Sequence, residues 1–190
     1  MRAALLCPGP SLERYAGRDG YDLVIAVNRA ATRYECDYWI AQDHSAYGHS
    51  HRADLPKLIG KPTWITNPST HKATLGSHPE SKRLAYIARN SIDFPSPPTW
   101  RTWSATIGLA LAAWRGATHI DCYGVDWTGT KDFDGVMLPE QIRDRRRWQR
   151  EINVWRGMYR RLSARGITFT RIGHEAEDVG FFDRPESDLE

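Results

Sequence analysis

The sequence predicts a single α/β domain with a mostly parallel sheet and helices on both faces. Three observations favour this fold class. Short apolar runs of strand length recur along the 190 residues. Segments of helical composition separate several of these runs, and the connections are mostly short. The length suits one hydrophobic core and leaves little room for two.

The predicted strands are short and apolar. They cover residues 3–6, 23–27, 38–41, 62–66, 119–123 and 167–172, with a further short strand at 86–88. The clearest is Leu23-Val24-Ile25-Ala26-Val27, which ends at Asn28. Runs of this kind, without polar alternation, indicate parallel strands that are buried on both faces.

Three helices are predicted between these strands. Ser11 is the expected N-cap of a brief helix after the first strand. Ser104 to Arg115 is rich in alanine and stops at Gly116, a typical C-terminal cap. A long helix is expected from Pro139 to about Arg165.

Composition narrows the class of protein. The net charge of +3 is too small to demonstrate a nucleic-acid partner. Cys7, Cys36 and Cys122 are odd in number and widely spaced, so we expect buried thiols and neither disulfides nor a zinc site. No run approaches the roughly 20 apolar residues of a membrane span, and no signal peptide is recognisable. These features predict a cytoplasmic protein without a membrane span.

Ligands of open parallel sheets bind beyond the carboxyl ends of the strands. The segments that follow the predicted strands are polar or contain glycine. They are Cys7-Pro8-Gly9-Pro10-Ser11, Asn28, Gln42-Asp43-His44 and Gly124-Val125-Asp126. This distribution predicts a ligand site of Rossmann-like type along that edge.

The loop from Cys7 to Ser11 is the most specific of these segments. Gly9 would let the backbone approach a ligand, and Ser11 would begin a helix whose free N–H groups face a phosphate. The loop is neither a Walker A sequence nor GxGxxG, which disfavours P-loop and dinucleotide redox chemistry. An ordinary strand-to-helix turn fits the same residues, and both interpretations stay open.

Three segments, in this order, resemble motifs of two related families. Leu6–Leu12 is similar to a G-x-G-P-S-L opening, and Ile25–Asn28 to a strand that ends in Asn. Ser104–Asp126 resembles a small-residue start, an Ala/Leu helix and a strand ending in G-x-D. The families are the bacterial sialyltransferases that use CMP-sialic acid and the MptE-like proteins, which include a 6-hydroxymethylpterin pyrophosphokinase. Phage-type members of the MptE-like group are nearest in size.

The resemblance covers roughly residues 2–134, except the long loop, and implies a nucleotide site. Its residues would be Gly9, Pro10, Ser11, Asn28, Ser104 and Gly124, and Asp43 matches an acid in the MptE-like group. One departure concerns the catalytic His that sialyltransferases place before their last long helix. Residues 138–148 contain no histidine here, which leaves the general base and the sugar open.

Candidates for the chemistry are Asp43, His44, Asp126 and Arg147. Asp126 could equally cap its own loop, and Asp134 is a further candidate base. No protein metal site is expected, because His49 and His51 lack a third ligand at suitable spacing. Mg²⁺ that bridges phosphates through Asp43 or Asp126 stays open as a cofactor.

Arg147 belongs to the strongest charge run, residues 143–151 of the predicted long helix. Arg147 or Arg143 would neutralise the phosphates of a donor as the bond breaks. Two alternatives remain: a solvated helix with internal ion pairs, and a basic surface at 140–165 that contacts nucleic acid. Four tryptophans lie in polar, loop-like or basic surroundings, where rings often stack on ligands: Trp100, Trp103, Trp127 and Trp148.

We therefore expect a nucleotide-dependent transferase, foremost a glycosyltransferase with a nucleotide-sugar donor. Residues 1–172 would form the nucleotide-binding domain, with a loop or lid at about 67–103 and a C-terminal tail at 173–190. The acceptor would be a glycan, a small molecule or a modified nucleobase in phage-type DNA. The alternatives are a Mg²⁺-dependent pyrophosphokinase or kinase of a hydroxymethyl group, and a non-catalytic nucleotide-binding module.

Overall fold

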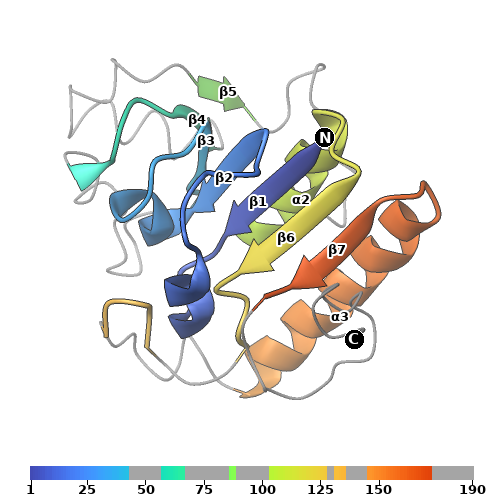
Figure 1. The fold of residues 1–190 in the computed structure, drawn as a ribbon. Coiled ribbons are helices and arrows are strands. Elements are labelled where there is room, and N and C mark those ends of the chain that lie inside the picture. The colour runs from blue at the N-terminus through green and yellow to red at the C-terminus, as the bar shows by residue number, and fades with distance from the viewer. Residues whose placement is uncertain (43–56, 67–85, 89–102, 128–130, 136–144, 173–190) are drawn as a thin grey trace, which may run out of the picture.

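The fold is a seven-stranded sheet with the strand order β5-β4-β3-β2-β1-β6-β7 (Figure 1). The computed structural model describes residues 1–42, 57–66, 86–88, 103–127, 131–135 and 145–172. The strands are β1 (Arg2–Leu6), β2 (Leu23–Val27), β3 (Tyr38–Ile40), β4 (Thr63–Thr66), β5 (Tyr86–Ala88), β6 (His119–Tyr123) and β7 (Thr168–Arg171). The helices are the short 3₁₀ helices η1 (Pro10–Arg14) and η2 (Asn28–Thr32), and α2 (Ser104–Trp114) and α3 (Arg145–Ser163).

Every pairing in the sheet is parallel, which confirms the predicted Rossmann-like α/β class. The chain builds the sheet outward from β1 to β5 and then returns to place β6 on the other side of β1. Leu5 therefore pairs with Ile25 of β2 and with Cys122 of β6. The topological switch point therefore lies at the carboxyl ends of β1 and β6, the place where sheets of this kind bind ligands.

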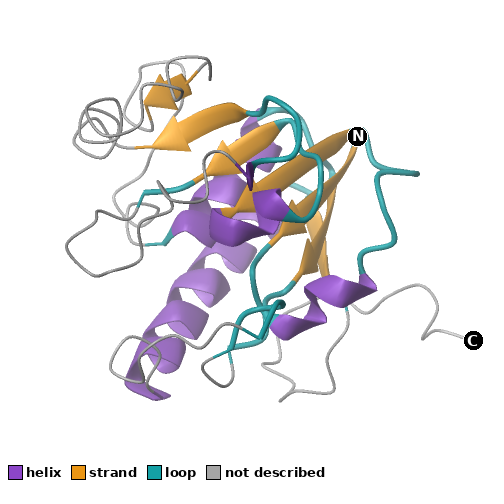
Figure 2. Ribbon diagram, turned by 90° about the vertical axis from the view of Figure 1, so that its left-hand side faces the viewer, coloured by secondary structure: helices purple, strands orange, loops and turns teal. Residues whose placement is uncertain are grey.

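The two faces of the sheet carry separate cores. Leu5, Ile25 and Phe169 belong to the core that α2 and α3 cover. Alternate residues of the same strands, such as Leu6 and Val24, belong to a second core under η1 and η2. Figure 2 shows the sheet from its side, with helical segments on both sides of it.

The two long helices are buried to different degrees. Residues 105–112 of α2 are all buried, as expected for a helix that is apolar all round. α3 buries one stripe, formed by Trp155, Met158 and Leu162, and Arg146, Arg150, Arg160 and Arg161 on it are exposed, whereas Arg147 is half-buried. α3 ends at Ser163, close to the predicted end, and Gly166 follows with a φ of 75°. The predicted start at Pro139 lies outside the described residues.

The predicted N-cap at Ser11 is wrong. η1 begins at Pro10, and Gly9 is its N-cap. Pro10 fits the first helical position because its φ is already fixed and it has no N–H to satisfy. Ser11 is consequently the second residue of η1, and its side chain is turned to another partner.

The three cysteines are free and buried, as predicted. Burial raises the pKa of Cys7 and Cys122 well above the ordinary thiol value, and raises the pKa of Cys36 to about 12. These thiols are packing groups of the core. Of the helices that the structure describes, none has both the length and the apolar character needed to cross a membrane.

Candidate ligand site at the carboxyl edge of the sheet

Four predicted site residues meet at the switch point and are joined by hydrogen bonds. The N–H of Gly9 donates to the carbonyl of Gly124 at 3.0 Å. The N–H of Gly124 donates to Oγ of Ser11 at 3.1 Å, and the N–H of Ser11 donates to Oδ2 of Asp126 at 2.8 Å. The loops after β1 and β6 are therefore joined to each other, although 113 to 115 residues separate them in sequence.

The two glycines of this junction have a structural reason that the sequence did not reveal. A Cβ on Gly9 would lie 2.5 Å from the carbonyl oxygen of Gly124 and would overlap the Asp126 carboxylate. A Cβ on Gly124 would overlap the carbonyl of Cys7, and Gly124 also has a φ of 67°. Both glycines thus allow the two loops to approach each other closely, whereas the sequence had suggested only that Gly9 lets a ligand approach.

Asp126 occupies the position that the sequence analysis left free for a phosphate. Its Oδ2 accepts the Ser11 N–H, so the start of η1 already holds an anionic group. η1 is only five residues long, which further weakens the expectation of a phosphate on its N-terminus. The Asp126 residue is 4% exposed, and its other oxygen, Oδ1, is buried without a hydrogen-bond partner. A buried carboxylate oxygen of this kind is suited to receive a donor from a ligand.

Asn28 and Thr66 present two further buried oxygens at the ends of strands. Asn28 follows β2 with a φ of 52°, a conformation that is uncommon for a non-glycine residue, and its Oδ1 has no hydrogen-bond partner. Thr66 ends β4, is fully buried and has an unpartnered Oγ1. Trp39 fixes the backbone of Asn28, because its Nε1 donates to the Asn28 carbonyl at 2.7 Å.

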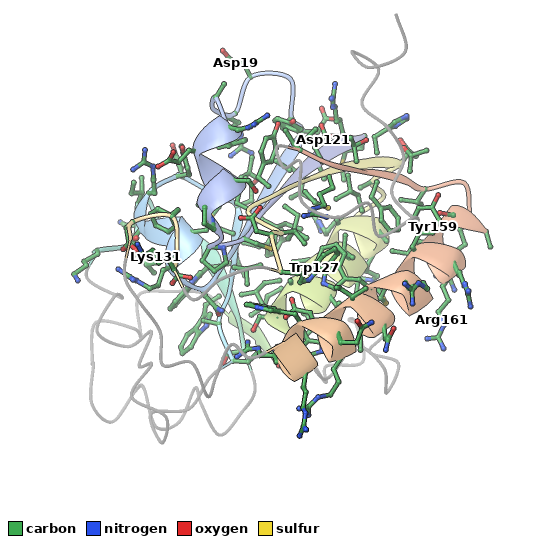
Figure 3. The ribbon with its side chains drawn as sticks, turned by 90° about the horizontal axis from the view of Figure 1, so that it is seen from below. Asp19, Asp121, Trp127, Lys131, Tyr159 and Arg161 are labelled. Carbon is green, nitrogen blue, oxygen red and sulfur yellow. The ribbon has the colours of Figure 1, made fainter. Side chains whose placement is uncertain are left out.

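Arg171 and Trp127 complete the edge on the side of β7. Arg171 is the last residue of β7, and its guanidinium lies 4.9 Å from the centre of the Trp127 ring. Figure 3 views the molecule from below, the side to which the arrows of Figure 1 point, and Trp127 lies near the middle of it. Trp127 was predicted from the sequence as a residue that could stack on a ligand, but Arg171 was not. Arg171 stands at the end of a predicted strand, which is the place where ligand residues of parallel sheets are expected.

A second contact covers the loop after β1. The N–H of Phe133 donates to the carbonyl of Pro8 at 2.8 Å, so residues 131–135 lie against this loop. Arg29 of η2 forms an ion pair with Asp134 and lies 3.9 Å from Asp132. Asp134, a candidate base from the sequence, is therefore already an ion-pair partner of Arg29.

Ser104 and Arg147 lie on the helical side of the same edge. Gln42, which follows β3, donates from Nε2 to Oγ of Ser104 at 3.4 Å. The guanidinium of Arg147, on α3, lies 5.0 Å from the centre of the Trp103 ring. Trp103 directly precedes Ser104 in the sequence. The structure thus brings these two predicted residues close to one tryptophan, and their roles in ligand binding stay predictions.

Two predicted catalytic residues, Asp43 and His44, lie outside the described residues, as does the part of the predicted basic surface before residue 145. Within the described ranges, no group of three or more His, Cys, Asp or Glu residues could hold a metal ion.

Three aspartates toward the opposite, amino-terminal edge of the sheet accept hydrogen bonds from nearby groups. Asp121 accepts from Nε of Arg2 at 2.9 Å and from the hydroxyl of Tyr21 at 2.8 Å. Asp22 accepts the N–H of Arg2, and Asp37 accepts the N–H of Val24. Asp126 at the carboxyl edge likewise has a partner on Oδ2, but its Oδ1 is buried without one.

No family model matches this chain, and no curated protein matches it in sequence. Solved structures do resemble it. One is the sialyltransferase CST-II in complex with a trisaccharide acceptor and CMP, at 10% identity and a TM-score of 0.54, covering 97% of this chain and 86% of that one. Another is CstII from Campylobacter jejuni with the substrate analogue CMP-3FNeuAc, at 10% identity and a TM-score of 0.55, covering 96% and 85%. A CST-II variant in complex with CMP has a TM-score of 0.57 at 10% identity, covering 97% and 86%. At this identity the likeness demonstrates a shared fold.

Proposed function

We propose that this chain is a glycosyltransferase that takes its sugar from a nucleotide-sugar donor bound at the carboxyl edge of the sheet. One observation carries the proposal. Buried polar atoms without partners, on Asn28, Thr66, Asp126 and Arg171, lie at the ends of four different strands. The described residues hold further such atoms elsewhere, including the hydroxyl of Tyr15 and Oγ of Ser163. Buried polar groups need partners, and a bound ligand would supply them.

A pyrimidine nucleotide is the donor class that we favour. Oδ1 of Asn28 and Oδ1 of Asp126 are acceptors without a donor. The hydroxyls of a ribose and the amino group of a base can donate hydrogen bonds to them. The comparison supports CMP in particular, since proteins of this fold have been solved with CMP and with a CMP-sugar analogue. Gly9, Pro10 and Ser11 would border the nucleotide, with Ser104 on its other side.

Arg147 is the residue that we propose for neutralising the phosphate that leaves the sugar. It lies on α3 next to Trp103, beside the start of α2. Asp43 and His44 remain candidates for the base that activates the acceptor hydroxyl. We propose a glycan as the acceptor, by likeness to the trisaccharide-bound structure. A modified nucleobase, and with it a phage or MptE-like relationship, receives no comparable support.

Binding of a ligand panel tests the proposal. Thermal shifts would be measured with cytidine, CMP, CDP, UDP, GDP, ATP and CMP-3FNeuAc, each with Mg²⁺ and with a chelator. We expect CMP and the CMP-sugar analogue to raise the melting temperature without a metal. A shift only with ATP and Mg²⁺ would instead identify the pyrophosphokinase alternative, and the absence of any shift would contradict a nucleotide site.

Asn28→Ala is the matched variant for this panel. Removing the amide should weaken CMP binding by about tenfold, the effect of one good hydrogen bond. Asn153→Ala, an exposed asparagine on α3, is the control and should bind as the wild type does. Equal affinity of both variants for CMP would exclude Asn28 from the site.

A further inference from the structure

Arg171 is placed at the carboxyl edge by the end of β7. Its neighbour across the sheet is Cys122 of β6, so its backbone is fixed by the ladder. The side chain lies on the same face as that of Phe169, two residues earlier, which is the face that α3 covers. The guanidinium therefore lies on the same side of the sheet as Trp127, at the end of β6 and β7.

The guanidinium is poorly satisfied for a charge in this position. Its Nε is buried and has no hydrogen-bond partner, and its Nη2 makes one long contact, 3.5 Å, to the backbone carbonyl of Asp126. Arg171 forms no ion pair with the described part of the chain, whereas Arg2, Arg18 and Arg29 do. Burial lowers the pKa of Arg171, and the nearby Asp126 carboxylate offsets only part of this effect.

The surroundings hold the guanidinium in place despite this cost. Trp127 lies beneath it, and the Trp127 ring packs edge-on against Trp155 of α3 at 5.5 Å. Trp127 has a φ of 49°, an uncommon backbone conformation for so bulky a residue. A costly backbone conformation and a partly buried charge thus occur together at one strand end. Such features concentrate at ligand sites.

We propose that Arg171 is an anion-binding residue, whose guanidinium receives a phosphate or carboxylate group of a ligand that lies across the ends of β6 and β7. The inference deepens the proposed function and depends on it only for the identity of the ligand. A guanidinium presents its donors as a planar fork that matches two oxygens of such a group. Trp127 would fix the plane of the fork, and Oδ1 of Asp126 would receive a donor of the same ligand.

Arg171→Met tests the proposal, because methionine keeps much of the side-chain length and removes the charge. Melting temperature of the free protein and affinities for cytidine, CMP and CMP-3FNeuAc would be measured. We expect affinity for CMP to fall by about tenfold or more, the usual effect of losing a charge-assisted hydrogen bond. Cytidine, which carries no anionic group, should bind as before. The free variant should melt at the wild-type temperature or above it, since a costly buried charge has been removed.

Arg165→Met is the matched control, because Arg165 is an exposed arginine after the end of α3. It removes the same charge and should leave both affinities unchanged. Arg171→Lys keeps the charge without the fork, and we expect an intermediate affinity for CMP with a wild-type melting temperature. If Arg171→Met does not fold, the CMP affinity of Arg171→Lys still tests whether Arg171 binds the anion.

The outcomes separate a ligand role from a structural one. A free Arg171→Met protein that melts lower, with an unchanged ratio of CMP to cytidine affinity, would overturn the proposal. Equal losses for CMP and CMP-3FNeuAc assign Arg171 to the phosphate, and a loss for the sugar analogue alone assigns it to the carboxylate. If the wild type binds no nucleotide, the proposed function fails. Pyrophosphate then tests the anion site, which stands only if it stabilises the wild type and not Arg171→Met.

Discussion

At the scale of single residues, Gly124 forms the closest junction between two parts of the chain described above. Its backbone has a φ of 67°, and a side chain there would overlap the carbonyl of Cys7. Gly166 has a similar φ of 75° but open space around it. Comparing substitutions at Gly124 and Gly166 therefore separates two contributions to the loss of stability: the left-handed backbone, which both share, and the overlap with Cys7, which only Gly124 has.

Gly124→Ala should lower the free energy of unfolding by about 3 kcal/mol or more, which combines a left-handed backbone with overpacking. Gly166→Ala, its control, should lose only about 1 kcal/mol. Urea denaturation of both variants measures the difference. Equal losses would mean that the loops after β1 and β6 separate easily, which would contradict the joined switch point.

Asp126 combines a structural and a proposed ligand role in its two oxygens. Asp126→Asn keeps an oxygen for the Ser11 N–H, so the free energy of unfolding should change by less than about 1 kcal/mol. Asp126→Ala leaves that buried N–H unpartnered and should cost about 1–3 kcal/mol. Denaturation of the free proteins gives these values, and CMP titration shows whether Asp126→Asn also weakens binding. An alanine variant as stable as the wild type would exclude the structural role.

At the scale of elements, four tyrosines connect η1, the start of β2, the end of η2 and β6. Tyr15 lies 4.9 to 6.0 Å, ring centre to ring centre, from Tyr34, Tyr123 and Tyr21. The hydroxyls of Tyr21 and Tyr123 are 2.7 Å apart. Burial is the main cause that raises the pKa of Tyr15, to about 12, and it also raises those of Tyr21 and Tyr123.

These raised pKa values predict a stability change in alkali. The folded state resists ionisation of Tyr15, whose ordinary pKa is 10.0. Its contribution is therefore complete below pH 10.0 and is lost as the pH rises toward about 12. Tyr15→Phe cannot ionise and should show a weaker decline of melting temperature over that range. Identical alkaline profiles of the variant and the wild type would contradict the assignment.

The strands and helices were largely predictable because each carries its own pattern. β2 is a continuous apolar run, and even β5 was anticipated inside the long proline-rich segment. α2 followed from its alanine-rich composition. The start of η1 was placed wrongly, since Ser11 is a strong N-cap by type, and its contact with Gly124 depends on a residue far along the chain.

The site was predictable only in part, for a related reason. The rule for parallel sheets led to Gly9, Ser11, Asn28 and Asp126, and the structure joins three of them at the switch point. The sequence could not show that the Ser11 N–H donates to Asp126, because only the pairing of β1 with β6 brings these two residues together. Arg171 was not predicted as a site residue, and nothing in the sequence shows that its guanidinium lies against the Trp127 ring.

At the scale of the whole molecule, the order of the strands has a consequence for how the protein forms during synthesis. β1 is made first and lies between β2 and β6, yet β6 begins 117 residues after Arg2. The second neighbour of β1 leaves the ribosome only after most of the chain. Contacts of such long sequence separation slow folding, because a large loop must close before they form. The nascent chain therefore leaves one edge of β1 unpaired until β6 is made, and we expect chaperones that bind unfinished chains to hold it during that time.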